Sequence, residues 1–240
     1  LTQGRIFDAL DPAVLRIPRP LGYLADLKLL LTEFLEGHLL ADELYRGDTV
    51  RSAQRMGAAL AAFHHSGVIC AKRWTIAREL SNAVRTCEES MLEPGRARAI
   101  ELEIRRAAAT VPVVAEVPVH RDYYLDQLFD CDQQTALFDL DDARQGEAAL
   151  DLGNFLAHLT LRPLQFPEVT SACAAARAPF LASYCSAASP IPGLMARTCI
   201  YEATSLLRLA GVYAGRPRWA DSIPVTLMDR CESVLSREDS

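Results

Sequence analysis

The stretch His120-Arg121-Asp122-Tyr123-Tyr124-Leu125-Asp126-Gln127 is followed, a short way along the chain, by Phe138-Asp139-Leu140-Asp141-Asp142. Two short apolar segments, 127–129 and 135–138, lie between these polar residues, and residues 132–134 favour a turn. The pattern predicts a small hairpin. Because a hairpin brings its two ends together, Asp122, Gln127 and Asp139 are expected to converge in space.

The side chains of this cluster offer oxygen atoms, and neither a thiol nor a pair of imidazoles. Oxygen is the ligand that hard cations such as Mg²⁺ prefer, and bound Mg²⁺ commonly bridges to substrate phosphates. The ends of the hairpin are therefore expected to carry the chemistry of the protein. His120 is expected to pack and hydrogen-bond under the loop, and Asp141 and Asp142 to form a solvated turn, with a secondary metal contact as the alternative.

Upstream of this hairpin, strand pattern gives way to helix pattern near Gly37. The apolar segments 21–24 and 27–34, with Ala25-Asp26 between them, predict a first hairpin that Gly37 ends. After Gly47 the apolar residues recur three and four apart, which predicts a helix that Asp48 or Thr49 caps. Two further helices are expected over 76–91 and 97–104.

Downstream of the central hairpin the pattern is helical, with helices expected over 148–161, 168–187, 193–213 and 221–236. The predicted fold is α+β. A strand-containing segment over residues 1–37 precedes a mainly helical body over 38–240 that holds the small hairpin. His158 is expected to be a core or groove residue, and Arg216-Arg218-Trp219 a surface loop.

The composition is that of a globular protein. The 240 residues are 50% hydrophobic and 23% charged, which excludes a disordered or collagen-like chain. With 25 basic against 31 acidic residues, the net charge of −6 argues against general nucleic-acid binding. The 7 cysteines include no C-x-x-C pair and are expected to be reduced. No membrane-length apolar run or signal peptide is recognisable, so a cytoplasmic protein is expected.

Taken together, the motifs resemble the aminoglycoside phosphotransferase and choline kinase family, which has the protein-kinase-like fold. The family pattern is H-G-D-x-x-x-x-N, then a hydrophobic-Asp pair, then a stretch similar to G-D-P-A-L-D-L-A. The first two parts match the residues quoted above, and residues 146–153 match the third. Residues 30–37 resemble the family's strand into the nucleotide hinge, and 58–64 its L-A-x-L-H helix end. The similarity covers nearly the whole chain in the same order.

The resemblance implies transfer of the γ-phosphate of ATP, or of GTP, to a hydroxyl group with the help of Mg²⁺. By this resemblance Asp122 is the catalytic residue that accepts or orients the proton of the acceptor. Asp139 and Gln127 are the metal ligands, although the family usually has Asn where Gln127 stands, one methylene shorter. The residues that contact the nucleotide would be those of the hinge, Thr32, Glu33, Phe34 and Leu35.

The length of the segment after Asp139 distinguishes protein kinases from kinases of small molecules. Protein kinases place a long activation segment and an A-P-E motif after the metal-binding Asp. Here only a short segment separates Asp139 from Asp151, and A-P-E is absent. The expected partners are therefore a nucleotide and a small hydroxyl-bearing molecule that is aminoglycoside-, choline- or sugar-like. Neither nucleic acid nor a membrane is expected, and the oligomeric state stays open.

The family's N-terminal lobe supplies a phosphate-covering loop and a strand lysine paired with a helix glutamate. This sequence has no G-x-G-x-x-G, and its only lysines, Lys28 and Lys72, do not stand where that lysine is expected. Residues 1–37 are therefore interpreted as the remnant of an N-terminal lobe and its hinge strand, which leaves this chain a poor catalyst. The alternative is a pseudokinase-like binding or regulatory module without turnover. A metal-dependent hydrolase using the same carboxylates is a third and weaker hypothesis.

Overall fold

The computed structural model describes residues 2–188 and 191–236. By their internal contacts, the residues fall into two compact units. Unit 1 comprises residues 1–72, 117–145 and 175–190, and unit 2 comprises residues 73–116, 146–174 and 191–240. Each unit has a buried apolar cluster of its own.

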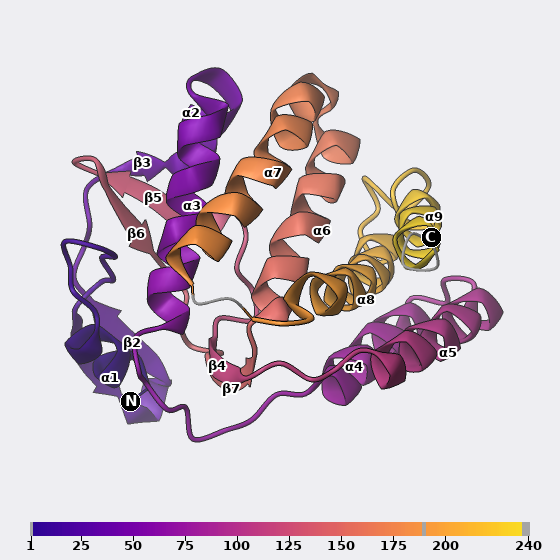
Figure 1. The fold of residues 1–240 in the computed structure, drawn as a ribbon, viewed down its shortest axis with the longest axis horizontal. Coiled ribbons are helices and arrows are strands. Elements are labelled where there is room, and N and C mark those ends of the chain that lie inside the picture. The colour runs from indigo at the N-terminus through magenta and orange to yellow at the C-terminus, as the bar shows by residue number, and fades with distance from the viewer. Residues whose placement is uncertain (1, 189–190, 237–240) are drawn as a thin grey trace. The chain divides into compact units, whose positions relative to one another are not determined.

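Unit 1 combines short strands with helices (Figure 1). Its helical elements are α1 (Thr2–Ala9), η1 (Ala25–Leu27), α2 (Leu40–Arg46), α3 (Thr49–His64) and η2 (Leu125–Gln127). Its strands are β1 (Pro20–Leu24), β2 (Leu29–Thr32), β3 (His38–Leu39), β5 (Leu128–Cys131) and β6 (Gln134–Leu137). β1 and β2 form one antiparallel sheet, and a second antiparallel sheet has the strand order β3-β5-β6.

The β5–β6 hairpin is the one that the central sequence pattern predicts. Leu128 pairs with Leu137, and Cys131 pairs with Gln134. The turn residues Asp132 and Gln133 have φ angles of 54° and 65°. Two successive positive φ angles define a type I′ turn, whose twist matches that of the flanking strands. The predicted hairpin is confirmed, and its ends are held at a fixed register.

Helix α3 is the central helix of unit 1. Asp48 caps its start by accepting a 2.9 Å hydrogen bond from the Arg51 amide, as the sequence predicts. The expected apolar stripe is buried at Ala53, Met56, Leu60 and Phe63, whereas its first member, Val50, is exposed. Gly57 lies against helix α7 (Thr170–Ala187), where a Cβ would collide with the carbonyl oxygen of Phe180. The absence of a side chain at Gly57 therefore permits the close approach of these helices.

Unit 2 is mainly helical. Its elements are α4 (Ile76–Glu89), α5 (Pro94–Thr110), α6 (Ala149–Gln165), η3 (Pro167–Val169), α8 (Leu194–Ala214) and α9 (Pro224–Leu235). Helix α8 packs against α4, α6 and α9, and α4 and α5 lie side by side (Figure 1). Strands β4 (Glu116–Val119) and β7 (Arg144–Glu147) pair with each other. Each of these strands, like α7, contains residues of both units.

The core of unit 2 forms around α8. Leu206 and Leu207 are fully buried in it, together with Leu80 of α4 and Met228 of α9. At Gly211 a Cβ would lie 2.6 Å from the backbone of α4, so glycine is needed for the observed contact. Burial of leucine and methionine side chains of this size stabilises a fold by roughly 2–3 kcal/mol each. None of the helices within 2–188 and 191–236 combines the length and apolar character that crossing a membrane requires.

The structure differs from the predicted elements in several places, among them strand β7, which the pattern does not predict, and α5, which is longer than the predicted 97–104. β2 ends at Thr32, not at Phe34, and residues 33–37 run on without strand structure. The pattern does not predict β3 or α2, because elements so short show no clear period. The predicted division at residue 37 does not coincide with the two units, since residues 117–145 and 175–190 join the N-terminal residues in unit 1. The division into lobes at that residue stays a prediction.

Candidate functional site

His120 lies at the centre of the predicted cluster. It is fully buried just after β4. Its Nε2 lies 2.7 Å from the carbonyl oxygen of Phe138, and its Nδ1 accepts a 3.3 Å hydrogen bond from the amide of Asp122. A carbonyl oxygen can only accept and an amide N–H can only donate, so in this pair of bonds Nε2 is the donor and Nδ1 the acceptor. His120 therefore ties the backbone at Asp122 to the residue that precedes Asp139.

The two predicted metal ligands lie side by side. Gln127 Nε2 is 3.3 Å from Asp139 Oδ2, and the Phe138 amide donates to the Gln127 carbonyl oxygen at 3.0 Å. A half-turn of the Gln127 amide group exchanges its nitrogen for its oxygen. Both side chains can then present oxygen to one cation, a donor set that fits Mg²⁺. The additional methylene of Gln127 leaves it within reach of Asp139.

The loop that carries Asp139 is braced by charge. Asp142 Oδ1 lies 3.0 Å from Arg144 Nη2, and Asp142 Oδ2 lies 3.5 Å from Arg121 Nη1. Arg121 has a φ of 75° and Asp139 a φ of 60°, so both adopt the left-handed conformation. Asp141 is exposed and forms no ion pair within the described ranges. The acidic turn therefore consists of one bridging carboxylate, that of Asp142, and one that faces solvent.

The predicted hinge residues have different environments. Leu35 is buried in an apolar cluster with Cys131 and Ala136, and Phe129 and Phe138 pack against this cluster. Phe34 is 91% exposed, and Thr32 is exposed at the end of β2. Glu33 accepts a 3.1 Å hydrogen bond from the Arg19 amide and donates its own amide to the Arg19 carbonyl. The hinge and the Phe138-Asp139 segment thus share one apolar cluster, a contact that sequence reasoning does not reveal.

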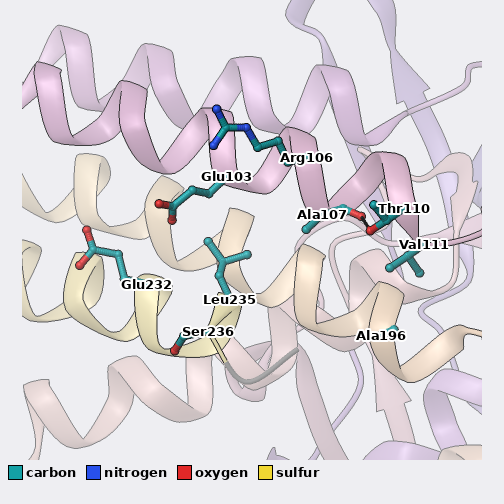
Figure 2. A pocket seen from close by; sticks show the side chains of 9 residues that line it. All are labelled: Glu103, Arg106, Ala107, Thr110, Val111, Ala196, Glu232, Leu235 and Ser236. Atoms are coloured by element: carbon teal, nitrogen blue, oxygen red, sulfur yellow. Dashed lines mark hydrogen bonds between the residues drawn. The ribbon is translucent and has the colours of Figure 1, made fainter. Parts of the chain in front are cut away.

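One hollow of unit 1 includes a hinge residue. Its volume is about 430 Å³, and it is lined by Phe7, Leu10, Leu15, Ile17 and Glu33, among others. A larger hollow of about 680 Å³ lies between α5, α8 and α9 of unit 2 (Figure 2). Figure 2 shows Glu103 and Arg106 of α5 with Glu232 and Leu235 of α9 around it. The larger hollow contains none of the predicted site residues.

A second group of polar side chains in unit 1 is a network of ion pairs. His38, Glu43 and Asp130 place potential ligand atoms within 4.8 Å of one another. Arg55 bonds to Glu43 at 3.3 Å and also to Asp130, and His38 Nε2 lies 3.2 Å from Glu43. Because Arg55 pairs with both carboxylates, we interpret this group as a network of ion pairs and not as a metal centre.

Residues 146–153 form a buried polar anchor in unit 2. Glu147 accepts hydrogen bonds from Arg197 Nε and Nη2 at 2.5 and 2.8 Å and from the Tyr201 hydroxyl at 2.9 Å. The bonds from Glu147 raise the pKa of Arg197, while burial and then Glu147 raise the pKa of Tyr201. Asp151 is fully buried in the first turn of α6. The stretch that matches the family's G-D-P-A-L-D-L-A therefore anchors the start of α6.

Comparison with known proteins identifies the family to which the chain belongs. A model of the phosphotransferase enzyme family matches residues 2–196. The sequence matches none of the curated proteins. Among solved structures, the chain is similar to a choline/ethanolamine kinase family protein from Mesorhizobium loti. The two are 15% identical with a TM-score of 0.66, over 98% of this chain and 76% of that one.

Two further solved structures are similar. One is a glucosamine kinase, at 20% identity and a TM-score of 0.58, over 97% of this chain and 70% of that one. The other is amicoumacin kinase hAmiN in complex with AMP-PNP, Ca²⁺ and Ami, at 13% identity and a TM-score of 0.69, over 98% and 77% of the two chains. These likenesses confirm the predicted kinase-like fold of helices and small sheets. Since the family model matches most of its length, the chain belongs to the phosphotransferase enzyme family.

Proposed function

We propose that this protein is a small-molecule kinase that transfers the γ-phosphoryl group of ATP, or of GTP, to a hydroxyl group of its acceptor. The observation that carries the proposal is the arrangement around His120. Its ring links Asp122 to Phe138, while Gln127 lies 3.3 Å from Asp139. Membership of the phosphotransferase family supports the same reaction class.

Each predicted residue has a role in this proposal. Asp139 and Gln127 would hold Mg²⁺, which would supply positive charge against the transferring phosphoryl group. Asp122 accepts a hydrogen bond from the acceptor hydroxyl and takes its proton as the oxygen attacks. A carboxylate suffices because phosphoryl transfer depends mainly on positioning and charge neutralisation. The nucleotide contacts the hinge residues, Thr32, Glu33, Phe34 and Leu35.

The acceptor in this proposal is a small hydroxyl-bearing molecule. Similar structures are named as kinases of choline/ethanolamine, glucosamine and amicoumacin, and one of them holds glucosamine, ADP and phosphate. A cytoplasmic location belongs to the same proposal, because ATP and reduced thiols are found there. None of the seven cysteines forms a disulfide within the described residues, and burial raises the pKa of Cys87 and Cys173 to about 11.

A second candidate function is nucleotide binding without turnover, and the lysines favour it. Lys28 is exposed after η1, and Lys72 is exposed before α4. Neither forms an ion pair within residues 2–188 and 191–236. Kinases of this fold use a lysine held by a glutamate to fix the nucleotide phosphates. If neither lysine of the described residues makes that contact, Mg²⁺ and nucleotide would bind at Asp139 while transfer stays slow.

Calorimetric titration with Mg·ATP and Mg·GTP tests the proposal. The variants are Asp139→Asn and Asp122→Asn, with Asp141→Asn as the matched control on the same loop. Asn tolerates the left-handed backbone at residue 139, so that variant should fold. We expect Mg²⁺-dependent binding that Asp139→Asn weakens about tenfold or more, whereas the other two variants bind like the parent.

Turnover is measured next, as ADP release with a panel of amine and sugar acceptors. We expect Asp122→Asn to abolish release while it spares binding. Binding of Mg·ATP to Asp139→Asn at parental affinity would refute the metal assignment. Binding by the parent without ADP release, with every acceptor, would establish the second candidate instead.

A further inference from the structure

The loop after α8, residues 215–222, carries two arginines whose guanidinium groups lie over aromatic rings. The Cζ of Arg216 is 4.5 Å from the ring centre of Tyr213, and the Cζ of Arg218 is 4.4 Å from that of Trp219. Stacking of this kind holds a guanidinium in one plane and leaves the N–H donors on its edges available. The loop therefore presents donors that are already oriented.

The same rings connect this loop to the C-terminal end of α6. Trp219 meets Phe166 edge to face, with ring centres 6.4 Å apart, and Arg162 lies 6.0 Å from the Phe166 ring centre. The Tyr213 hydroxyl accepts a 2.8 Å hydrogen bond from Gln165. We name this set the arginine–aromatic cluster, and all its members belong to unit 2: Arg162, Phe166, Tyr213, Arg216, Arg218 and Trp219.

The loop also carries one carboxylate, that of Asp221, which is exposed and forms no ion pair with either arginine. Arg216 and Arg218 are exposed and form no ion pair with any residue of 2–188 or 191–236. Other arginines of unit 2 do pair with carboxylates, as at Arg85, Arg96, Arg98, Arg105 and Arg197. Arg78, Arg106 and Arg230 are also exposed without an ion pair in the described part of unit 2, so what distinguishes Arg216 and Arg218 is their position over aromatic rings.

The imidazole of His158, one turn before Arg162 on α6, lies in the same positive field. Burial lowers the pKa of His158 well below its usual value, and Arg208, Arg162 and Arg216 lower it further. All the charged groups that shift this pKa are arginines. Arg208 is itself held by Glu79 at 3.3 Å and by Asn154 at 2.7 Å, whereas Arg216 forms no ion pair within the described residues.

Helix dipoles explain only part of this arrangement. The negative ends of α6 and α8 favour a basic residue in or near the last turn of each helix, which accounts for Arg162 and Arg216. They do not account for Arg218, which follows the end of α8 by several residues. Nor do they explain why the guanidinium groups of the loop are stacked on rings.

We propose that the arginine–aromatic cluster binds a small anion through a carboxylate or phosphate group. The planar edges of stacked guanidinium groups match the two oxygens of either group and bind them with paired, charge-assisted hydrogen bonds. The inference concerns unit 2 alone. It does not depend on the proposed phosphotransfer, because the cluster contains none of the residues Asp122, Gln127 and Asp139.

The test is calorimetric titration of the full chain with inorganic phosphate and, separately, with succinate, at fixed ionic strength and with EDTA present. EDTA removes Mg²⁺, so the heat cannot arise from metal-dependent binding at Asp139. We expect saturable binding of at least one probe, and the two titrations distinguish a phosphate ligand from a carboxylate ligand. Failure of both probes to bind would overturn the proposal, whatever the result with Mg·ATP.

Variants locate the binding. Arg216→Gln with Arg218→Gln should weaken it about tenfold or more. The matched control, Arg78→Gln with Arg85→Gln, removes the same charge from exposed positions of α4 and should change it less than about twofold. Equal losses in the two double variants would mean general attraction to positive charge and would refute a built site. Replacing Arg216 and Arg218 by Lys keeps the charge without the planar fork, and undiminished binding by that variant would also refute it.

Tryptophan fluorescence provides a second readout of location. The chain has 2 tryptophans, Trp219 in the cluster and Trp74 before α4. Anion binding should change the emission of the parent and of Trp74→Phe, whereas Trp219→Phe, which retains a ring for Arg218, should show no change. The opposite pattern would place the anion away from the cluster. Melting temperatures of all variants check that each one is folded.

Discussion

The ring of His120 donates a 2.7 Å hydrogen bond to the carbonyl oxygen of Phe138, the residue that precedes Asp139. The other ring nitrogen accepts from the Asp122 amide. A single buried side chain thus sets the spacing between the proposed base and the proposed metal ligand. The His120 ring bonds to backbone atoms and so fixes the positions from which the Asp122 and Asp139 side chains extend. It does not itself contact the groups that these carboxylates are proposed to bind.

Replacing His120 by Ala should therefore damage catalysis more than folding alone explains. We expect kcat to fall about a hundredfold, because small displacements of reacting groups cost that much, and nucleotide affinity to fall much less. The matched control is His64→Ala, since His64 is also buried in unit 1 and bonds to the Tyr184 hydroxyl at 2.9 Å. Steady-state kinetics on both folded variants would decide, and equal kcat values would contradict the role given to His120.

Asp142 should matter for activity and little for stability. Its side chain is 67% exposed, and ion pairs of this kind stabilise a fold by about 1 kcal/mol at most. Asp142→Asn removes its bridge to Arg121 and Arg144, so we expect kcat to fall a few-fold while the free energy of unfolding barely changes. Asp141→Asn is the control. The difference between the two variants should shrink in 0.5 M salt, at roughly a 4 Å Debye length, and a difference that persists would argue against the ion pairs as its cause.

The Glu147–Arg197 pair should dominate the stability of unit 2. Both side chains are buried, and loss of one partner leaves the other charge unpaired, which costs about 3–5 kcal/mol. Glu147→Gln is expected to lower the free energy of unfolding by that amount in urea titration. The double variant Glu147→Leu with Arg197→Met should be less destabilised than Glu147→Gln. A double variant that is the less stable of the two would show that hydrogen bonding to Tyr201 outweighs the charge effect.

His158 should make the protein acid-sensitive. Its folded-state pKa is lowered by burial and by Arg208, Arg162 and Arg216, so only the unfolded chain takes up this proton as the pH falls through about 6.5. The unfolded state then binds more protons, and stability is lost below that pH by up to about 1.4 kcal/mol per unit. Urea titrations from pH 7.5 to 5 should show a shallower acid slope in His158→Gln. Exposed His38→Gln is the control, and parallel slopes for the parent and His158→Gln would contradict this assignment.

Local pattern predicted the elements that carry the site. Asp48 caps α3 where its type and position indicate, and the turn of the central hairpin falls within 132–134, so that Gln127 and Asp139 meet. These outcomes depend on period and turn chemistry over a few residues. Family resemblance added the reaction class, and the family model confirmed the family.

Contacts between distant segments could not be predicted in the same way. Periodicity tells which face of a helix is buried, and not which residue it meets. The bonds from Arg55 to Asp130 and from Arg197 to Glu147 join positions 75 and 50 residues apart. The stacking of Arg216 on Tyr213 depends on the path of the chain after α8 ends, where hydrophobic spacing says nothing.

The left-handed backbone of Asp139, with a φ of 60°, also bears on how this protein evolves. An aspartate in that conformation costs roughly 1 kcal/mol relative to glycine. Glycine or asparagine at this position would give a chain that folds at least as well and has lost the carboxylate. Selection for stability alone would therefore favour loss of the proposed metal ligand. In a lineage in which phosphotransfer is no longer under selection, residue 139 should be among the first residues to be substituted. The resulting proteins should be more stable than their ancestor.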